Sequence, residues 1–132
     1  MSQHEPRVLD VGQCDFDHGN IGKMLVEQFG AVVDRAHNTD EAIKAISKNR
    51  YDIVMVNRIF DAGGAEGTEL IKKLLADESN RRTTVMLVSN YADAQDAAVA
   101  LGAKRGFGKD AISDPATIQC LAAFLRPTDL ST

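Results

Sequence analysis

Short apolar runs alternate along the chain with segments in which apolar residues recur every three or four positions. A continuous apolar run of about four residues is typical of a strand covered on both faces, and the three-to-four spacing is typical of a helix with one buried side. The alternation occurs five times in 132 residues, with no internal repeat or linker. It therefore predicts five strand–helix units in one domain.

The expected elements follow from this pattern. Glycine or proline bounds several of them, and two helix starts carry capping signals, at Asn38 with Glu41 and at Asp114–Pro115. The expected strands are 8–11, 31–33, 53–56, 85–88 and 105–108. Five helices are expected, of which the fourth is the alanine-rich segment 93–101. The residues on the buried sides of the other four are, in chain order, Ile21, Met24, Leu25 and Phe29; Ala42, Ile43 and Ile46; Leu70, Ile71, Leu74 and Leu75; and Ile118, Leu121, Ala122 and Leu125.

Strands that alternate with helices need right-handed crossovers, so the predicted fold is α/β, with a parallel sheet and helices on both faces. Five strands suit the flavodoxin-like doubly wound order 2-1-3-4-5. We expect the domain to span residues 5–126 and residues 127–132 to form a short C-terminal tail. In this fold, function gathers in the loops at the carboxyl ends of the strands, here after Val11, Val56, Val88 and Gly108.

Charge and composition exclude several classes of function. The formal net charge of −4 argues against a nucleic-acid-binding protein. No apolar run approaches the roughly 20 residues that cross a bilayer, and the first residues do not form a secretory signal. We therefore expect no membrane association and a cytoplasmic location.

The cysteines and histidines form no recognisable site. Cys14 and Cys120 are too few for a disulfide scaffold and too far apart for a CxxC motif, and the three histidines are scattered. We expect Cys14 in a loop and Cys120 in the core, in a reducing compartment. Zinc enzymes and cysteine proteases are thereby excluded, and we expect no metal site and no catalytic residue.

The residues at the four strand ends are Gly12–Gln13, Asn57, Ser89 and Lys109. With them, nearly the whole chain resembles the receiver domain of two-component response regulators. The resemblance rests on the order and spacing of four stretches: RVLDVGQ, YDIVMVNRIFDAGGAEGTEL, TVMLVSNYADAQDAAVALGA and GFGKD.

The resemblance implies a site for phosphoryl transfer in which this chain matches only two positions. In the family, an aspartate after strand 3 accepts a phosphoryl group, an acidic pair after strand 1 holds Mg²⁺, and a Ser or Thr and a Lys contact the phosphoryl oxygens. Here Ser89 and Lys109 match, but the acceptor position is Asn57 and the acidic pair is Gly12 and Gln13. A carboxamide has no anionic oxygen to attack phosphorus. We therefore expect no acyl phosphate and weak or absent Mg²⁺ binding.

Three further departures indicate a lost switch. The position of the family's switch aromatic is Gly106, and Phe107, one residue along, faces the opposite side of a strand and is expected in the core. Asp110 stands where the family has a proline, so no cis peptide is expected there. The loop after Asn57 is about two residues longer than usual.

The predicted function is that of a degenerate receiver in phosphorelay-type signalling, a non-enzyme that binds a protein partner without being phosphorylated. In the family, helix 4, strand 5 and helix 5 form the partner or dimer face. Here that face runs from about Asp93 to Leu125 and would serve a partner or a homodimer.

Two alternatives use the same site, for phosphorylation or for anion binding, and a third is a cofactor site on the same fold. Asp15, Asp17 or Asp61 could replace the missing carboxylates in a phosphorylatable receiver. Alternatively, Lys109, Ser89 and loop amides could hold a small anion noncovalently. A flavodoxin-like cofactor site is disfavoured, because the loop after strand 1 is acidic and only 5% of residues are aromatic.

Overall fold

The computed structural model describes residues 5–125, in which five strands and five α-helices alternate. The strands are β1 (Arg7–Val11), β2 (Val32–Ala36), β3 (Ile53–Asn57), β4 (Thr84–Val88) and β5 (Lys104–Phe107). The helices are α1 (Asp15–Phe29), α2 (Thr39–Lys48), α3 (Gly67–Ala76), α4 (Ala92–Leu101) and α5 (Pro115–Ala122), with short 3-10 helices η1 (Glu78–Asn80) and η2 (Lys109–Ala111).

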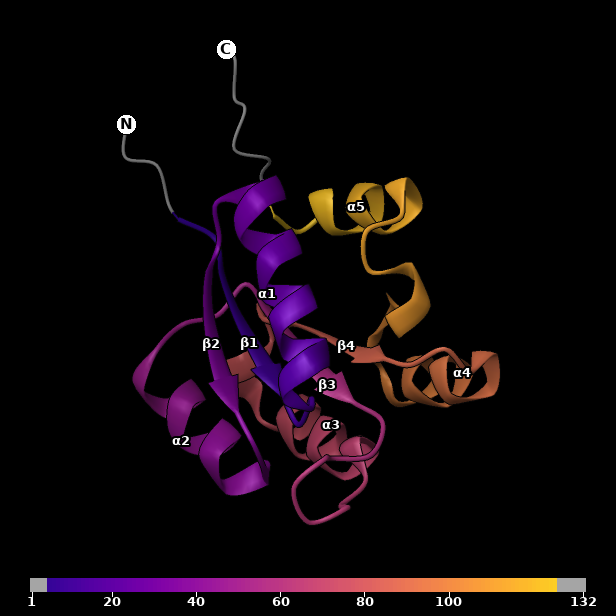
Figure 1. The fold of residues 1–132 in the computed structure, drawn as a ribbon. Coiled ribbons are helices and arrows are strands. Elements are labelled where there is room, and N and C mark those ends of the chain that lie inside the picture. The colour runs from indigo at the N-terminus through magenta and orange to yellow at the C-terminus, as the bar shows by residue number, and fades with distance from the viewer. Residues whose placement is uncertain (1–4, 126–132) are drawn as a thin grey trace.

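The strands form one parallel sheet in the order β2-β1-β3-β4-β5, which confirms the predicted α/β fold (Figure 1). Strand β1 lies between β2 and β3, with Val8 beside Ile53 and Val11 beside Val56. Because β1 has crossovers leaving on both sides of it, the carboxyl ends of β1 and β3 flank the switch point of the sheet.

Two apolar cores separate the sheet from its helices. Helices α2, α3 and α4 pack on one face, against side chains such as Leu9, Val54 and Leu87. Helices α1 and α5 pack on the other face, against Val8 and Met55. All five residues of β3 are buried, as the continuous apolar run of this central strand predicts.

Several local predictions need correction. Helix α1 begins at Asp15, so Asp15 and Asp17 lie in its first turn rather than in a loop, and Cys14 is its N-cap. Cys120 is exposed instead of buried, because α5 turns Thr117 and Leu121 toward the core and Cys120 away from it. Two expected core residues, Ile43 and Leu75, are also exposed.

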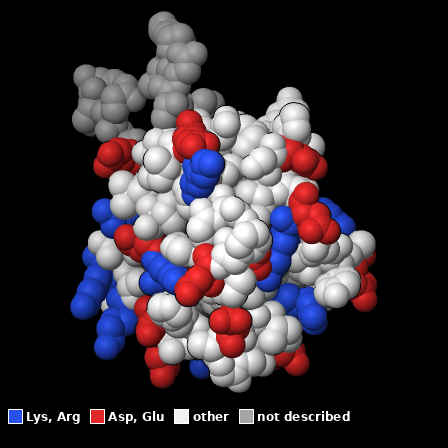
Figure 2. Space-filling view, in the orientation of Figure 1, with Lys and Arg blue, Asp and Glu red and all other residues white. Residues whose placement is uncertain are grey.

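The predicted tail, residues 127–132, lies outside the described residues, as does residue 126 of the predicted domain. Within residues 5–125 no helix is both long and apolar enough to cross a bilayer. Acidic and basic side chains are interspersed over the face of the molecule shown in Figure 2.

Candidate functional site

The predicted site residues gather at the carboxyl edge of the sheet. Gly12 and Gln13 follow β1, Asn57 ends β3, and Ser89 follows β4. Lys109 begins η2, just beyond β5. Gln13, Asn57 and Ser89 are all at least nine-tenths buried. Asn57 and Ser89 make hydrogen bonds within the protein, whereas the Gln13 side-chain amide has no hydrogen-bond partner among the described residues.

Asn57 connects two loops through its side-chain amide. Its Nδ2 group donates to the carbonyl oxygen of Gly12 at 2.9 Å and to that of Ile59 at 2.7 Å. Two carbonyl acceptors demand a group with two N–H donors, which an amide supplies and an ionised carboxylate does not. The Asn57 side chain, at the position that the resemblance aligns with the family's phosphoacceptor, therefore connects the β1 and β3 loops by hydrogen bonds.

Gly12 leaves no room for an acidic side chain after β1. Its φ angle of +81° lies in the left-handed region, and a Cβ built on it would overlap the ring of Phe60. Phe60 is itself almost completely buried, so its ring has little freedom to move aside. The β3 loop thus fills the space that a carboxylate at position 12 would need.

Two of the three carboxylates that could replace the acidic pair, Asp15 and Asp17, are paired with cations. Asp17 Oδ2 lies 3.0 Å from Lys109 Nζ, and Asp15 Oδ1 lies 2.8 Å from Arg35 Nη2. Asp61 is exposed on the loop after β3 and contributes its backbone N–H to Gly12. The lysine of the crevice therefore has an internal counter-ion within the first turn of α1.

The buried side chain of Gln95 connects helix α4 to the sheet by hydrogen bonds. Its Nε2 donates to the carbonyl oxygens of Leu87 at 2.9 Å and Ser89 at 3.2 Å, and its Oε1 accepts the N–H of Gly106 at 2.9 Å. A Cβ at position 106 would overlap the carbonyl oxygen of Leu87. Gly106, which the resemblance aligns with the family's switch aromatic, therefore has no room for a side chain and donates its N–H to Gln95.

Other predictions about this edge are confirmed. Phe107 is buried and packs in the core beneath α1 and α5. No cis peptide occurs in the described residues, including the bond after Lys109. Ser89 Oγ accepts the N–H of Tyr91 at 3.1 Å, which fixes the start of the turn into α4.

Beside the crevice, a buried aspartate contacts a histidine, and this contact is not predicted by the sequence. Asp10, completely buried in the middle of β1, lies 2.7 Å from His18 Nδ1 on α1. Burial raises the pKa of Asp10, although His18, Gln13 and Arg35 oppose that rise. In the sequence, the single aspartate within the apolar run of β1 is the only sign of this contact, because a buried charge requires a partner.

The residues present do not fit a magnesium ion. Mg²⁺ prefers hard oxygen ligands, usually with one or two carboxylates among them. The Gly12 and Ile59 carbonyl oxygens are already bound by Asn57, and Asp17 is held by Lys109. Among residues 5–125, no cluster of three or more His, Cys, Asp or Glu side chains is placed to hold a metal ion.

Solved structures of response regulators share this fold. The signal receiver domain of a DNA-binding response regulator from Colwellia psychrerythraea matches with a TM-score of 0.76 at 18% identity, over 90% of this chain and 97% of that one. A chemotaxis response regulator from Vibrio cholerae matches with a TM-score of 0.73 at 18% identity, over 92% and 100%.

A third match is a structure that contains a phosphorylated residue. It is a response regulator from Burkholderia pseudomallei, solved with a phosphorylated aspartic acid, a calcium ion and citrate, with a TM-score of 0.69 at 23% identity over 95% of this chain and 68% of that one. No protein-family model and no curated protein sequence matches the chain. The described residues thus have the fold of these receiver domains.

Proposed function

We propose that this chain is a receiver-fold signalling module that acts by binding a protein partner, without phosphorylation and without Mg²⁺. The observation that carries the proposal is the pair of hydrogen bonds from Asn57 Nδ2 to the Gly12 and Ile59 carbonyl oxygens. The amide connects the two loops permanently, so no phosphoryl group or metal is needed to order them. The chain would then present one arrangement of its surface at all times.

The proposed interaction surface is the face formed by α4, β5 and α5, from about Asp93 to Leu125. Gln95 fixes α4 on the sheet through the backbone of Leu87, Ser89 and Gly106. On the outer side of α4, Val99 is 42% exposed among small residues, which would let a partner approach closely. A protein partner and a second copy of this chain are both compatible with this surface.

The alternative of a phosphorylatable receiver with rearranged ligands has weaker support. The use of Asp15 or Asp17 would require that carboxylate to leave Arg35 or Lys109, and Asp61 is exposed on the loop after β3 rather than buried in the crevice. Noncovalent anion binding at the crevice would likewise require Lys109 to give up the carboxylate 3.0 Å away. We therefore place the proposed function on the surface and not in the crevice.

An NMR titration tests this proposal. We expect the backbone amide signals of Gly12, Asn57, Ser89 and Lys109 to stay in place when MgCl₂ and then beryllium fluoride, a phosphoryl mimic, are added at millimolar concentration. The reason is that Asn57 is already bound to the Gly12 carbonyl oxygen and Lys109 is already paired with Asp17. A receiver domain with its aspartates intact serves as the positive control. Saturable shifts confined to these four residues would overturn the proposal.

A further inference from the structure

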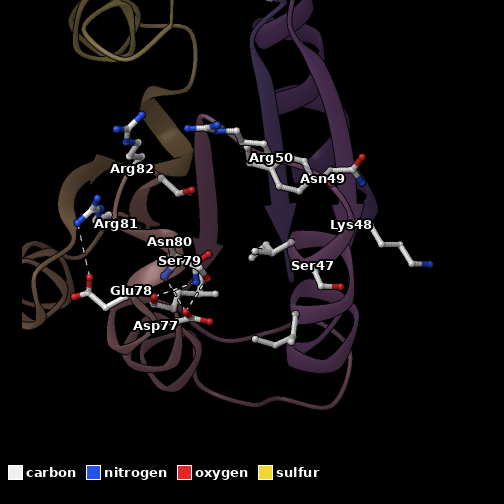
Figure 3. A pocket seen from close by; sticks show the side chains of 15 residues that line it. Ser47, Lys48, Asn49, Arg50, Asp77, Glu78, Ser79, Asn80, Arg81 and Arg82 are labelled. Carbon is white, nitrogen blue, oxygen red and sulfur yellow. Dashed lines mark hydrogen bonds and ion pairs between the residues drawn. The ribbon is translucent and has the colours of Figure 1, made fainter.

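A pocket with a volume of about 970 Å³ lies at the amino edge of the sheet, opposite the crevice (Figure 3). One wall is the end of α2 and the chain leading into β3, and the other wall is the segment 77–83 around η1. We call this pocket the basic groove. Its size is at the upper end of the roughly 300–1,000 Å³ of small-molecule sites.

The walls of the basic groove are held by hydrogen bonds that do not depend on a ligand. Asn80, which is buried, donates from Nδ2 to the Leu74 carbonyl oxygen at 3.2 Å, and its own carbonyl oxygen accepts the N–H of Thr83 at 2.9 Å. The N–H of Thr84 donates to the Asp52 carbonyl oxygen at 3.0 Å, which joins the two walls. The groove is therefore preformed.

The charge of the basic groove is positive in a chain that is negative overall. Four cations line it, Lys48, Arg50, Arg81 and Arg82, against two carboxylates, Asp77 and Glu78. Both carboxylates are engaged: Asp77 Oδ1 accepts from the N–H and Oγ of Ser79, and Glu78 lies 4.0 Å from Arg81. The hydrogen bonds from Ser79 lower the pKa of Asp77.

Arg50 and Arg82 are the cations left to bind a ligand. Within the part of the chain that the structure describes, neither makes an ion pair or a side-chain hydrogen bond. Figure 3 shows their side chains reaching from opposite walls toward the same side of the groove, whereas Lys48 points away. A guanidinium group binds phosphate oxygens through two parallel N–H donors.

The lining of the groove also includes apolar side chains among polar ones. Ile43, Ile46 and Leu74 contribute to its lining, and Ile43 is 42% exposed although it belongs to a helix whose other apolar residues face the core. An apolar surface beside two free guanidinium groups suits a ligand that has both a ring system and an anionic group. The groove thus combines the two features that a nucleotide requires.

We propose that the basic groove binds a small phosphorylated molecule with an aromatic or apolar ring body, of the nucleoside diphosphate class. Arg50 and Arg82 bind the phosphate groups, and Ile43 and Ile46 contact the ring. The groove and the crevice lie at opposite edges of the sheet. This inference therefore goes beyond the proposed function and stands or falls separately from it.

The test uses ADP as the probe, with adenosine and inorganic pyrophosphate as partial ligands, in buffer without divalent cations. NMR titration of the full chain should show saturable shifts in residues 43–51 and 77–83, with ADP binding more tightly than either partial ligand. We expect Arg50→Gln and Arg82→Gln each to weaken ADP binding by about tenfold, since each removes a charge-assisted contact.

The matched control is Lys23→Gln, which removes the same charge from α1 on the other face of the sheet. It should change ADP affinity less than about twofold, because exposed charges on opposite faces are largely screened. Equal losses in all three variants would reduce the effect to net charge and overturn the proposal. So would the absence of saturable shifts up to about 10 mM ADP, or pyrophosphate binding as tightly as ADP.

Discussion

Replacing Asn57 by aspartate is expected to lower the free energy of unfolding by about 3 kcal/mol at pH 8. The substitution removes both N–H donors and leaves an anionic carboxylate facing the Gly12 and Ile59 carbonyl oxygens. Three oxygens would then meet in a site that is at least nine-tenths buried. Urea unfolding followed by circular dichroism measures the loss.

The pH dependence of this variant identifies the cause. A protonated aspartic acid can donate one hydrogen bond, so the stability difference between Asn57→Asp and wild type should shrink as the pH falls from 8 to about 4.5. Asn90→Asp is the matched control, because the Asn90 amide uses its Oδ1 as an acceptor for the N–H of Asp110, which a carboxylate also provides. If Asn57→Asp lowered the free energy of unfolding no more than the control does, the role of Asn57 as a donor to both loops would be contradicted.

Introducing the family's switch aromatic, as Gly106→Tyr, is expected to destabilise the chain by about 4 kcal/mol or more. Any Cβ at this position overlaps the Leu87 carbonyl oxygen, which belongs to the neighbouring strand and cannot move alone. Shifting β5 would also break the hydrogen bond from the Gly106 N–H to Gln95 Oε1. Urea unfolding again gives the magnitude.

Gly19→Tyr is the control for the size of the new side chain. Gly19 is exposed in α1, and a Cβ there meets no atom within 4 Å. Since glycine is a poor helix former, this change should be neutral or stabilising by about 0.5 kcal/mol. If Gly106→Tyr unfolded within about 1 kcal/mol of wild type, the sheet would accept an aromatic side chain at this position, contrary to our account.

Much of the fold could be predicted from the sequence because burial controls the pattern of each element. The apolar run of β3 and the helical spacing of Ile21, Met24 and Leu25 identify a covered strand and a one-sided helix. The boundary between a loop and the following helix is predicted less well where a residue of the loop can also cap the helix. Cys14 caps α1 and the helix begins at once, so the expected loop is short.

The positions of the site residues could be predicted, but their contacts could not. The strand ends placed Asn57 and Gly12 at one edge, because parallel strands end together. That the Asn57 amide donates to Gly12, that Asp17 reaches Lys109, and that Gln95 fastens α4 depend on side-chain directions that only the packed structure determines. The sequence does not predict the basic groove for a related reason, because its two walls come from segments more than 25 residues apart.

Intact-mass spectrometry after incubation with acetyl phosphate and Mg²⁺ tests the central claim most directly. The account predicts an unchanged mass at every time point, while a receiver domain with its acceptor aspartate, treated in parallel, gains one phosphoryl group. A phosphoryl adduct on this chain that disappeared in Asp17→Asn or Asp61→Asn would contradict the account, because another carboxylate would then serve as the acceptor.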